Sequence, residues 1–384
     1  MTPPPSGPAG RDFLFVQSTT EVGGAETVLL NLFEASAELR ARGVVATLGF
    51  GSGDLPQRLR ALGAEVVEIP RVRLREAMRL PRTFSALRTL ARSRGVRVVV
   101  GNGAHPQVFG GLIARLSGAR SAFLVHMIYQ TQLWKNDPRD VLALLGPCDL
   151  MLAVSRAAQA PLGALRPTVR NQSFYAGTPH REVAAADALA ARHELGAGPD
   201  DILFGVFGRL QRWKGQDVFV EAAAEVARAR PRTRFAIVGG SVFGLEPEFF
   251  TGLERRAKEL GLGERIRFTG FRTDAARLMA GCDVVCHTTR VAEPFGMVVI
   301  EAMDLGRPVV ATRGGGPSEV ISSDEIGILV PPDDVGALAR TMLDLVDDPD
   351  RRQRLGRRGA ERVRADFTTN AGAASLLQHL ESLM

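Results

Sequence analysis

Short apolar runs alternate with longer amphipathic segments along the whole chain of 384 residues. The longer segments, such as 25–40 and 107–116, carry apolar residues at the three- and four-residue spacing of helices. Strands separated by helices of that length predict βαβ units and a parallel sheet. In the first half the expected strands are 13–17, 44–50, 65–69, 96–100, 122–126 and 149–154.

The alternation restarts in the second half. Strands are expected at 202–207, 234–238, 266–268, 284–287, 308–311 and 327–330, and helices at 215–228, 247–260, 274–280, 297–304 and 335–346. We therefore expect an α/β fold of two Rossmann-like, doubly wound parallel-sheet domains facing across a cleft, with ligands at the carboxyl ends of the strands. The expected parts are a disordered tail (1–10), a first domain (11–180), a second domain (181–368) and a last helix (369–384) that packs back on the first domain.

The apolar runs, the start of the sequence and the cysteines indicate the cellular compartment of the protein. No apolar run reaches the roughly 18 residues that span a bilayer, and the Pro- and Gly-rich start has no signal-peptide pattern. Three cysteines, Cys148, Cys282 and Cys286, without an export signal favour a reducing environment over a disulfide framework. We expect a cytoplasmic protein, with peripheral attachment to a membrane as an open alternative.

Charge is spread unevenly along the chain. Residues 1–180 hold 21 Lys and Arg against 12 Asp and Glu, whereas the rest holds 27 against 30. The densest basic segment, 71–97, has nine arginines opposed by Glu76 alone. It is either a solvated helix face or a contact for anionic lipid or an anionic acceptor. Its one aromatic residue, Phe84, offers little on which bases can stack, so we expect no nucleic-acid partner.

The segment 208–215 follows an expected strand directly and runs into an expected helix. Gly208 allows the backbone to turn sharply there. Arg209 and Lys214 stand five residues apart on this loop, where two cations can hold a diphosphate. The alternative is two ordinary surface cations in an Arg-rich chain. The order of residues is not that of a Walker loop.

A second candidate element lies at a later strand end. Phe295, Gly296 and Met297 stand at the start of a helix, whose free N–H groups favour an anion. Glu301 follows about one and a half turns further on, among apolar neighbours, where a carboxylate needs a partner such as a pair of sugar hydroxyls. Glu293 lies in the preceding loop. The alternatives are a buried salt bridge for Glu301 and an exposed or helix-start acid for Glu293.

Two more strand ends carry glycines, at 239–240 and 314–316. Each alone is an ordinary turn signal. Four strand ends of one domain that all suit a nucleotide diphosphate-sugar are a stronger indication than any one of them.

Together, the spans 208–215, 239–241, 268–271 and 293–319 resemble the donor domain of the family 4 retaining glycosyltransferases of the GT-B fold. The resemblance is collinear over about residues 200–335, and its Glu-x7-Glu element with an internal Pro-Phe-Gly is highly specific. The resemblance implies that Arg209 and Lys214 bind the donor diphosphate and that Glu301 holds the ribose hydroxyls. The sequence departs from the family pattern at His287-Thr288-Thr289, where Pro-Ser is usual.

The resemblance also implies contacts to the sugar and the base. Glu293 would hold the transferred sugar together with backbone groups, and Gly208 and Gly240 would line the donor site. The implied backbone contacts are those of Phe295, Gly296, Met297 and Val298 with the sugar and of Phe271 and Arg272 with the base.

In the first half, Gly23 and Gly24 follow the first strand and open a helix, which favours a phosphate. His126 ends a strand, where a lone histidine is usually structural. The resemblance assigns both to the donor: the glycine pair to binding, and His126 to a sugar hydroxyl near the anomeric carbon. His105 is expected to be mainly structural.

No second carboxylate in the first half is placed to act as a nucleophile. We expect transfer on one face with retention, aided by charge stabilisation from Arg209 and Lys214. No Asp-x-Asp pattern stands out, so we expect no metal ion and no cofactor. The expected partners are a nucleotide-sugar donor and a sugar, glycan or lipid-linked acceptor. The alternatives are a nucleotide-sugar epimerase, a non-catalytic binding partner and a phosphorylase, for which no cofactor lysine site is found.

Overall fold

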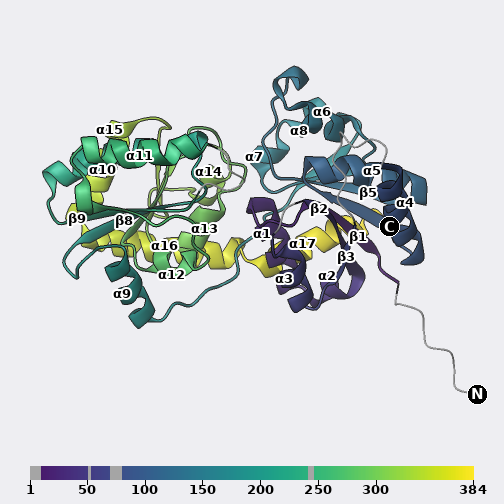
Figure 1. The fold of residues 1–384 in the computed structure, drawn as a ribbon, viewed down its shortest axis with the longest axis horizontal. Coiled ribbons are helices and arrows are strands. Elements are labelled where there is room, and N and C mark those ends of the chain that lie inside the picture. The colour runs from purple at the N-terminus through teal and green to yellow at the C-terminus, as the bar shows by residue number, and fades with distance from the viewer. Residues whose placement is uncertain (1–9, 51–52, 70–79, 241–245) are drawn as a thin grey trace, which may run out of the picture. The chain divides into compact units, whose positions relative to one another are not determined.

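The computed structural model describes residues 10–50, 53–69, 80–240 and 246–384. It divides the chain into two compact units (Figure 1). The first unit is Met1–Pro179 with Thr369–Met384, and the second is His180–Thr368. No helix in the described part of the chain is long and apolar enough to cross a membrane.

The first unit is built on a parallel sheet of seven strands in the order β3-β2-β1-β4-β5-β6-β7. Its central strands are almost wholly buried, as expected for strands covered on both faces. The strands are β1 (Phe13–Thr19), β2 (Gly43–Phe50), β3 (Glu65–Glu68), β4 (Val98–Asn102), β5 (Arg120–Val125), β6 (Leu150–Ala153) and β7 (Arg170–Ser173).

Helices cover this sheet, and the last helix of the chain packs against α1. The single helix predicted over 25–40 is wrong: the chain forms two helices, because Ser36 ends the first and its Oγ accepts a hydrogen bond from the Leu39 amide to cap the second. The helices are α1 (Gly24–Ala35), α2 (Ala37–Arg42), α3 (Leu55–Ala61), α4 (Leu80–Ser93), α5 (Ala104–Ser117), α6 (Pro138–Leu145), α7 (Arg156–Gln159), α8 (Leu162–Leu165) and α17 (Thr369–Glu381).

The second unit has a parallel sheet of six strands in the order β10-β9-β8-β11-β12-β13. Helices α10, α11 and α15 lie over one face, and α9, α12 and α16 lie over the other (Figure 1). The strands are β8 (Ile202–Phe207), β9 (Thr233–Val238), β10 (Ile266–Phe268), β11 (Val284–His287), β12 (Val309–Thr312) and β13 (Ile328–Val330). The helices are α9 (Ala185–Glu194), α10 (Gln216–Ala229), α11 (Pro247–Glu259), α12 (Ala275–Ala280), α13 (Met297–Asp304), α14 (Pro317–Val320), α15 (Val335–Asp347) and α16 (Pro349–Asp366).

Both sheets reverse their strand order once. In the first unit the reversal lies between β1 and β4, and in the second between β8 and β11. Ligands of open parallel sheets bind outside the carboxyl ends of the two strands that flank such a reversal. The predicted α/β fold of two doubly wound parallel sheets is therefore confirmed. In each sheet, the carboxyl ends of the two strands at the reversal are the expected place for a binding site.

Candidate functional site

In the second unit, the backbone segments that follow β8, β9 and β10 lie very close to one another. Gly208, at the end of β8, and Gly239, at the end of β9, have φ angles of 133° and 151°, which favour glycine. A Cβ on Gly239 would lie 1.8 Å from the Gly208 carbonyl oxygen. A Cβ on Gly240 would lie 2.9 Å from the Phe271 amide nitrogen. The predicted residues Gly208, Gly240 and Phe271 therefore form one backbone surface.

The strand ends that flank the reversal are joined by an ion pair. Lys214 belongs to a short 3-10 helix, η3 (Arg212–Lys214), and its Nζ donates to Glu293 Oε2 at 2.7 Å. The two side chains are only 14% and 15% exposed. His287, at the end of β11, places Nε2 at 3.5 Å from the same oxygen. Two residues that the sequence assigns to the donor thus meet across 79 positions.

The surroundings of Glu293 decide its charge. Burial alone would raise the pKa of this carboxyl, but the nearby Lys214 and His287 outweigh burial and lower the pKa to about 2. Glu293 is therefore a carboxylate at neutral pH, and it accepts hydrogen bonds only.

Arg209 lies on the same loop, partly buried. Its carbonyl accepts a hydrogen bond from Gln216 Nε2 at 2.8 Å, which fixes the backbone. Among the residues that the structure describes, no carboxylate pairs with its guanidinium. Its guanidinium donors are therefore not engaged by a carboxylate of the described residues, as the binding of a phosphate requires.

Arg290 holds the loop that carries Lys214 in place, and the sequence gave no indication of this role. Its amide donates to the Trp213 carbonyl at 2.8 Å, and its guanidinium grips both oxygens of Asp217 at 2.7 and 2.9 Å. Its Nε donates to Asp333 at 2.6 Å. These contacts tie the Lys214 loop to α10 and to the segment that follows β13.

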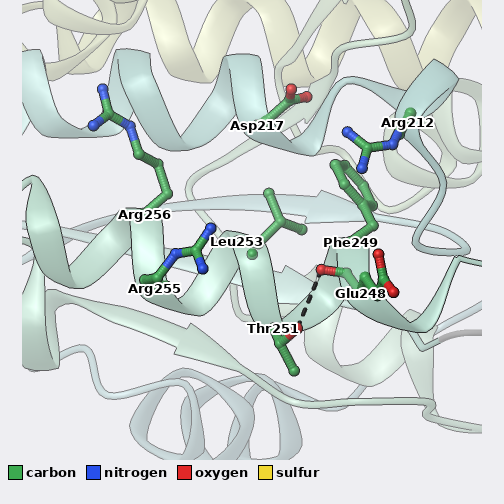
Figure 2. A pocket seen from close by; sticks show the side chains of 9 residues that line it. Arg212, Asp217, Glu248, Phe249, Thr251, Leu253, Arg255 and Arg256 are labelled. Carbon is green, nitrogen blue, oxygen red and sulfur yellow. Dashed lines mark hydrogen bonds between the residues drawn. The ribbon is translucent and has the colours of Figure 1, made fainter.

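A groove of about 500 Å³ lies beside the contacts of Arg290, between α10 and α11 (Figure 2). Its charged walls are mostly engaged within the protein. Arg256 pairs with Glu221 at 2.5 Å, and the Arg212 guanidinium lies 5.4 Å from the centre of the Phe249 ring. Asp217 holds Arg290. The predicted site residues do not line this groove.

The start of α13 is packed backbone to backbone. Gly296 caps the helix with a φ of 89°. The Gly316 amide donates to the Glu293 carbonyl at 2.8 Å, and a Cβ on Gly315 would lie 2.0 Å from that same oxygen. The predicted order of Phe295, Gly296 and Met297 at the helix start is confirmed, and the first-turn amides of Met297 and Val298 have no intrahelical acceptor.

Glu301, in the second turn of α13, differs from Glu293 in the direction in which its pKa is shifted. Burial raises its pKa to about 7, and the charge of Arg181 opposes this rise. At neutral pH its carboxyl is therefore divided between the protonated and ionised forms, so it can donate as well as accept.

Arg272 and Phe271 offer mainly their backbone. The Arg272 guanidinium holds both oxygens of Asp274 at 2.8 Å and also pairs with Glu194. The Phe271 side chain is 66% exposed. A side-chain role for Arg272 in binding would require the loss of these pairs.

In the first unit the predicted residues follow β1 and β5, the two strands on either side of β4. Gly23 caps α1, and its amide donates to Glu26 Oε2 at 3.0 Å. His126 directly follows β5, and its Nε2 lies 2.7 Å from Oδ1 of Asn102, the last residue of β4. Burial lowers the pKa of His126 to about 4, so the ring is neutral at physiological pH. His105 lies on α5 beside Phe109, with ring centres 5.4 Å apart.

Sequence reasoning missed several residues that shape these edges. Asn102 and Gln17 are polar residues at the ends of apolar strands, a signal that was available in the sequence. His287 likewise ends β11. Asp217 and Arg290 gave no such signal, because one is an ordinary helix-start acid and the other an ordinary loop arginine.

Comparison with known proteins agrees with this geometry. The family model "Glycosyl transferases group 1" matches residues 188–362, and "Glycosyltransferase Family 4" matches residues 22–169. The GDP-mannose-dependent alpha-(1-6)-phosphatidylinositol monomannoside mannosyltransferase of Mycolicibacterium smegmatis is 30% identical over 290 residues, which are 72% of this chain and 74% of that protein. The chain belongs to the family 4 glycosyltransferases.

Other members of the family 4 glycosyltransferases match over shorter segments. The lipopolysaccharide core biosynthesis mannosyltransferase LpsB of Rhizobium meliloti is 32% identical over 200 residues, 52% of this chain and 56% of LpsB. The chain spans about half the length of several of the curated relatives that it matches. Among solved structures, that of Anabaena HepE in complex with UDP-glucose superposes with a TM-score of 0.84 at 25% identity, and it covers 96% of this chain and 99% of HepE.

Proposed function

We propose that this protein transfers a sugar from a nucleoside diphosphate-sugar to a hydroxyl of an acceptor, with retention at the anomeric carbon. The observation that carries the proposal is the Lys214–Glu293 ion pair at the β8/β11 reversal, 2.7 Å long and largely buried. An ion pair held in a site that also offers the guanidinium donors of Arg209 supplies both a cation for a leaving diphosphate and an anion for sugar hydroxyls.

The donor would change the partners in this site. Its diphosphate oxygens offer Lys214 and Arg209 stronger acceptors, and Glu293 is then released to accept from a hydroxyl of the transferred sugar. The bond between the anomeric carbon and the diphosphate oxygen breaks as the acceptor oxygen bonds to that carbon on the same face. The acceptor proton passes to the departing diphosphate. The two cations stabilise the charge that develops on the leaving group, so we propose that transfer requires no metal ion.

The printed names of relatives support the class of donor. HepE binds UDP-glucose, and the Mycolicibacterium relative is GDP-mannose-dependent. A sugar joined to a nucleoside diphosphate is common to both. Glu301 would hold the ribose hydroxyls, for which a carboxyl that both donates and accepts is suited. We expect the first-turn amides of α13 to face the sugar and Phe271 to lie against the base.

We propose a lipid-linked or glycan acceptor and peripheral contact with an anionic membrane. Residues 71–79 of the basic segment lie outside the described part of the chain. On α4, Arg82, Arg88 and Arg92 are exposed, as electrostatic attachment requires. The test is sedimentation with vesicles that contain anionic lipid, at low salt and at 0.5 M salt. Absence of binding at low salt contradicts this part of the proposal.

The donor is tested by a thermal-shift screen of UDP, GDP and ADP and of their sugars. A ligand at 100 times its dissociation constant stabilises a protein by ~2.7 kcal/mol, so binding of one base series is readily detected. The stabilisation should disappear in Arg209→Ala and persist in Arg255→Ala, which removes an exposed arginine of α11. No shift with any nucleotide, in a protein that unfolds cooperatively, contradicts the proposal.

Transfer itself is measured as release of nucleoside diphosphate from the donor identified in that screen. Acceptor-dependent release with an α-linked product from an α-linked donor supports retention. Conversion of the donor without any acceptor would instead identify an epimerase.

A further inference from the structure

A line of buried polar side chains connects the start of α1 to His126 in the first unit. Gln17 Nε2 donates to Glu26 Oε1 at 2.5 Å, and Asn102 Nδ2 donates to Gln17 Oε1 at 2.6 Å. Asn102 Oδ1 then lies 2.7 Å from His126 Nε2. Gln17 is 0% exposed and Asn102 is 2% exposed, so water does not compete for these contacts.

The direction of every bond in this line is fixed from the Glu26 end. The Gly23 amide donates to Glu26 Oε2 at 3.0 Å, and Glu26 Oε1 accepts from Gln17 Nε2. Gln17 must therefore turn its NH₂ group towards Glu26. Its carbonyl oxygen then faces Asn102, which must turn its own NH₂ group towards Gln17 and its oxygen towards His126.

A second observation fixes the Asn102 amide independently. Its Nδ2 also lies 3.4 Å from the Ala25 carbonyl oxygen, which can only accept. Both neighbours therefore place Nδ2 away from the histidine and Oδ1 beside it. Because Oδ1 is an acceptor, the proton of the neutral His126 ring must lie on Nε2.

We propose that Glu26, Gln17 and Asn102 are positioning residues that hold His126 as its Nε2–H tautomer, so that the Nδ1 lone pair accepts a hydrogen bond from a hydroxyl of the bound sugar. The identity of that hydroxyl rests on the proposed function, whereas the tautomer does not. In the part of the chain that the structure describes, His126 Nδ1 has no hydrogen-bond partner, and the residue is partly exposed.

This arrangement makes His126 selective for a donor of hydrogen bonds. A ring free to choose its tautomer could present either a lone pair or an N–H group, whereas the fixed tautomer presents only a lone pair. A donor analogue with fluorine or hydrogen in place of the contacted hydroxyl would leave Nδ1 without a partner. The same Glu26 carboxylate caps α1, so the line also couples His126 to the Gly23–Gly24 turn.

The tautomer is tested on the full chain by two-bond ¹H–¹⁵N spectra after labelling with ¹⁵N-histidine. The His126→Asn variant assigns the His126 signals among the six histidines. The expected result is a protonated Nε2 and an unprotonated Nδ1 at pH 7, without any substrate. A protonated Nδ1 overturns the proposal.

Glu26→Gln tests the origin of this tautomer. Gly23 and Gln17 donate to different oxygens of Glu26, and in glutamine one of these positions is an NH₂ group that cannot accept, so the Gln17 and Asn102 amides can turn over. We expect a mixture of His126 tautomers and a roughly 10- to 100-fold loss of turnover, the range known for the loss of a hydrogen-bond partner that orients a metal-binding histidine. Glu65→Gln is the matched control, because Glu65 pairs with Arg11 and Arg94 in the same unit, away from this line.

An unchanged tautomer in folded Glu26→Gln overturns the proposal, as does an equal effect of Glu65→Gln on the His126 signals. Asn102→Asp keeps an acceptor beside Nε2 and adds a charge. It should retain the Nε2–H signal and raise the pKa of His126, which a pH titration of the same spectra measures. If the wild type shows the Nε2–H tautomer but binds no nucleotide in the thermal-shift screen, the proposed function fails and the tautomer stands.

Discussion

Lys214→Ala removes the cation on which the second-unit site depends. It leaves the Glu293 carboxylate largely buried, with His287 Nε2 at 3.5 Å from Glu293 Oε2. The pKa of Glu293 is about 2, against an ordinary value of 4.5. At 1.36 kcal/mol per pKa unit, this difference corresponds to about 3 kcal/mol of stability at pH 7. Removal of one partner of a buried pair costs a similar amount, about 3–5 kcal/mol.

The pH dependence has a definite sign. The folded-state pKa of Glu293 is depressed, so its contribution to stability is fully present above pH 4.5 and is lost as the pH falls from 4.5 towards 2. In Lys214→Ala burial is opposed by one neighbour fewer and the pKa of Glu293 rises, so the difference in unfolding free energy between wild type and variant should be larger at pH 7 than at pH 3.5. Urea unfolding followed by circular dichroism at pH 7 and at pH 3.5 measures it.

Activity and stability are separated by a double variant. Lys214→Ala should lower transfer by at least ~100-fold, as loss of a charge-stabilising group usually does. Lys214→Ala/Glu293→Gln removes the stranded charge as well. It should recover most of the lost stability but none of the lost transfer. Near-normal turnover in folded Lys214→Ala refutes the phosphate role, and unchanged stability at pH 7 refutes the energetic argument for the pair.

Three further predictions concern the same unit. The folded-state pKa of Glu301 is raised to about 7, so its contribution to stability is lost as the pH rises through 7. Glu301→Gln should therefore be more stable than wild type by up to about 3 kcal/mol at pH 8 but not at pH 4.5 in urea unfolding, and equal curves at pH 8 contradict this. A lysine at position 290 cannot bind both oxygens of Asp217, so Arg290→Lys should lower the free energy of unfolding by about 1–2 kcal/mol in the same assay. An unchanged free energy of unfolding would show that the contacts of Arg290 are unimportant for stability. Gly239→Ala places a Cβ on a residue with a positive φ of 151° and should lower the free energy of unfolding by at least about 1–3 kcal/mol. Gly252→Ala, in open space on helix α11, should raise the free energy of unfolding by about 0.5–1 kcal/mol. Equal melting temperatures for the two variants would contradict the strain argument.

The elements that the sequence predicted well are those with strong punctuation. Helix α13 has the predicted bounds, 297–304, because Gly296 precedes it and Gly306 and Pro308 follow it. Strands β8, β10 and β11 also have their predicted bounds, because each is a short apolar run closed by a turn residue or a polar side chain.

Of the elements that the sequence analysis missed, two were missed for identifiable reasons. Strand β7 (Arg170–Ser173) is a polar edge strand with no apolar alternation, so only its pairing with β6 reveals it. Helix α16 (Pro349–Asp366) is rich in arginine, and small residues such as Gly356 and Gly359 make up much of its buried face. Its start was nevertheless recognisable, because Asp348 caps it and Pro349 stands at its first position.

The candidate site was predictable as separate residues but not as an assembly. Lys214 and Glu293 were each singled out by their place at a strand end, yet their ion pair spans 79 positions. His287 entered only as a departure from the family pattern, and the structure places it against Glu293. No periodicity connects residues so far apart, because their distance is set by the order of strands in the sheet.

The sequence by itself indicated many of the segments that become strands and helices, where glycines permit turns, and which strand ends carry charge. These are local properties, because periodicity and backbone freedom act over a few residues. Only the tertiary structure decided which of these groups meet and in which protonation state. The low pKa of Glu293, the high pKa of Glu301 and the neutral ring of His126 all follow from burial and from neighbours contributed by distant segments.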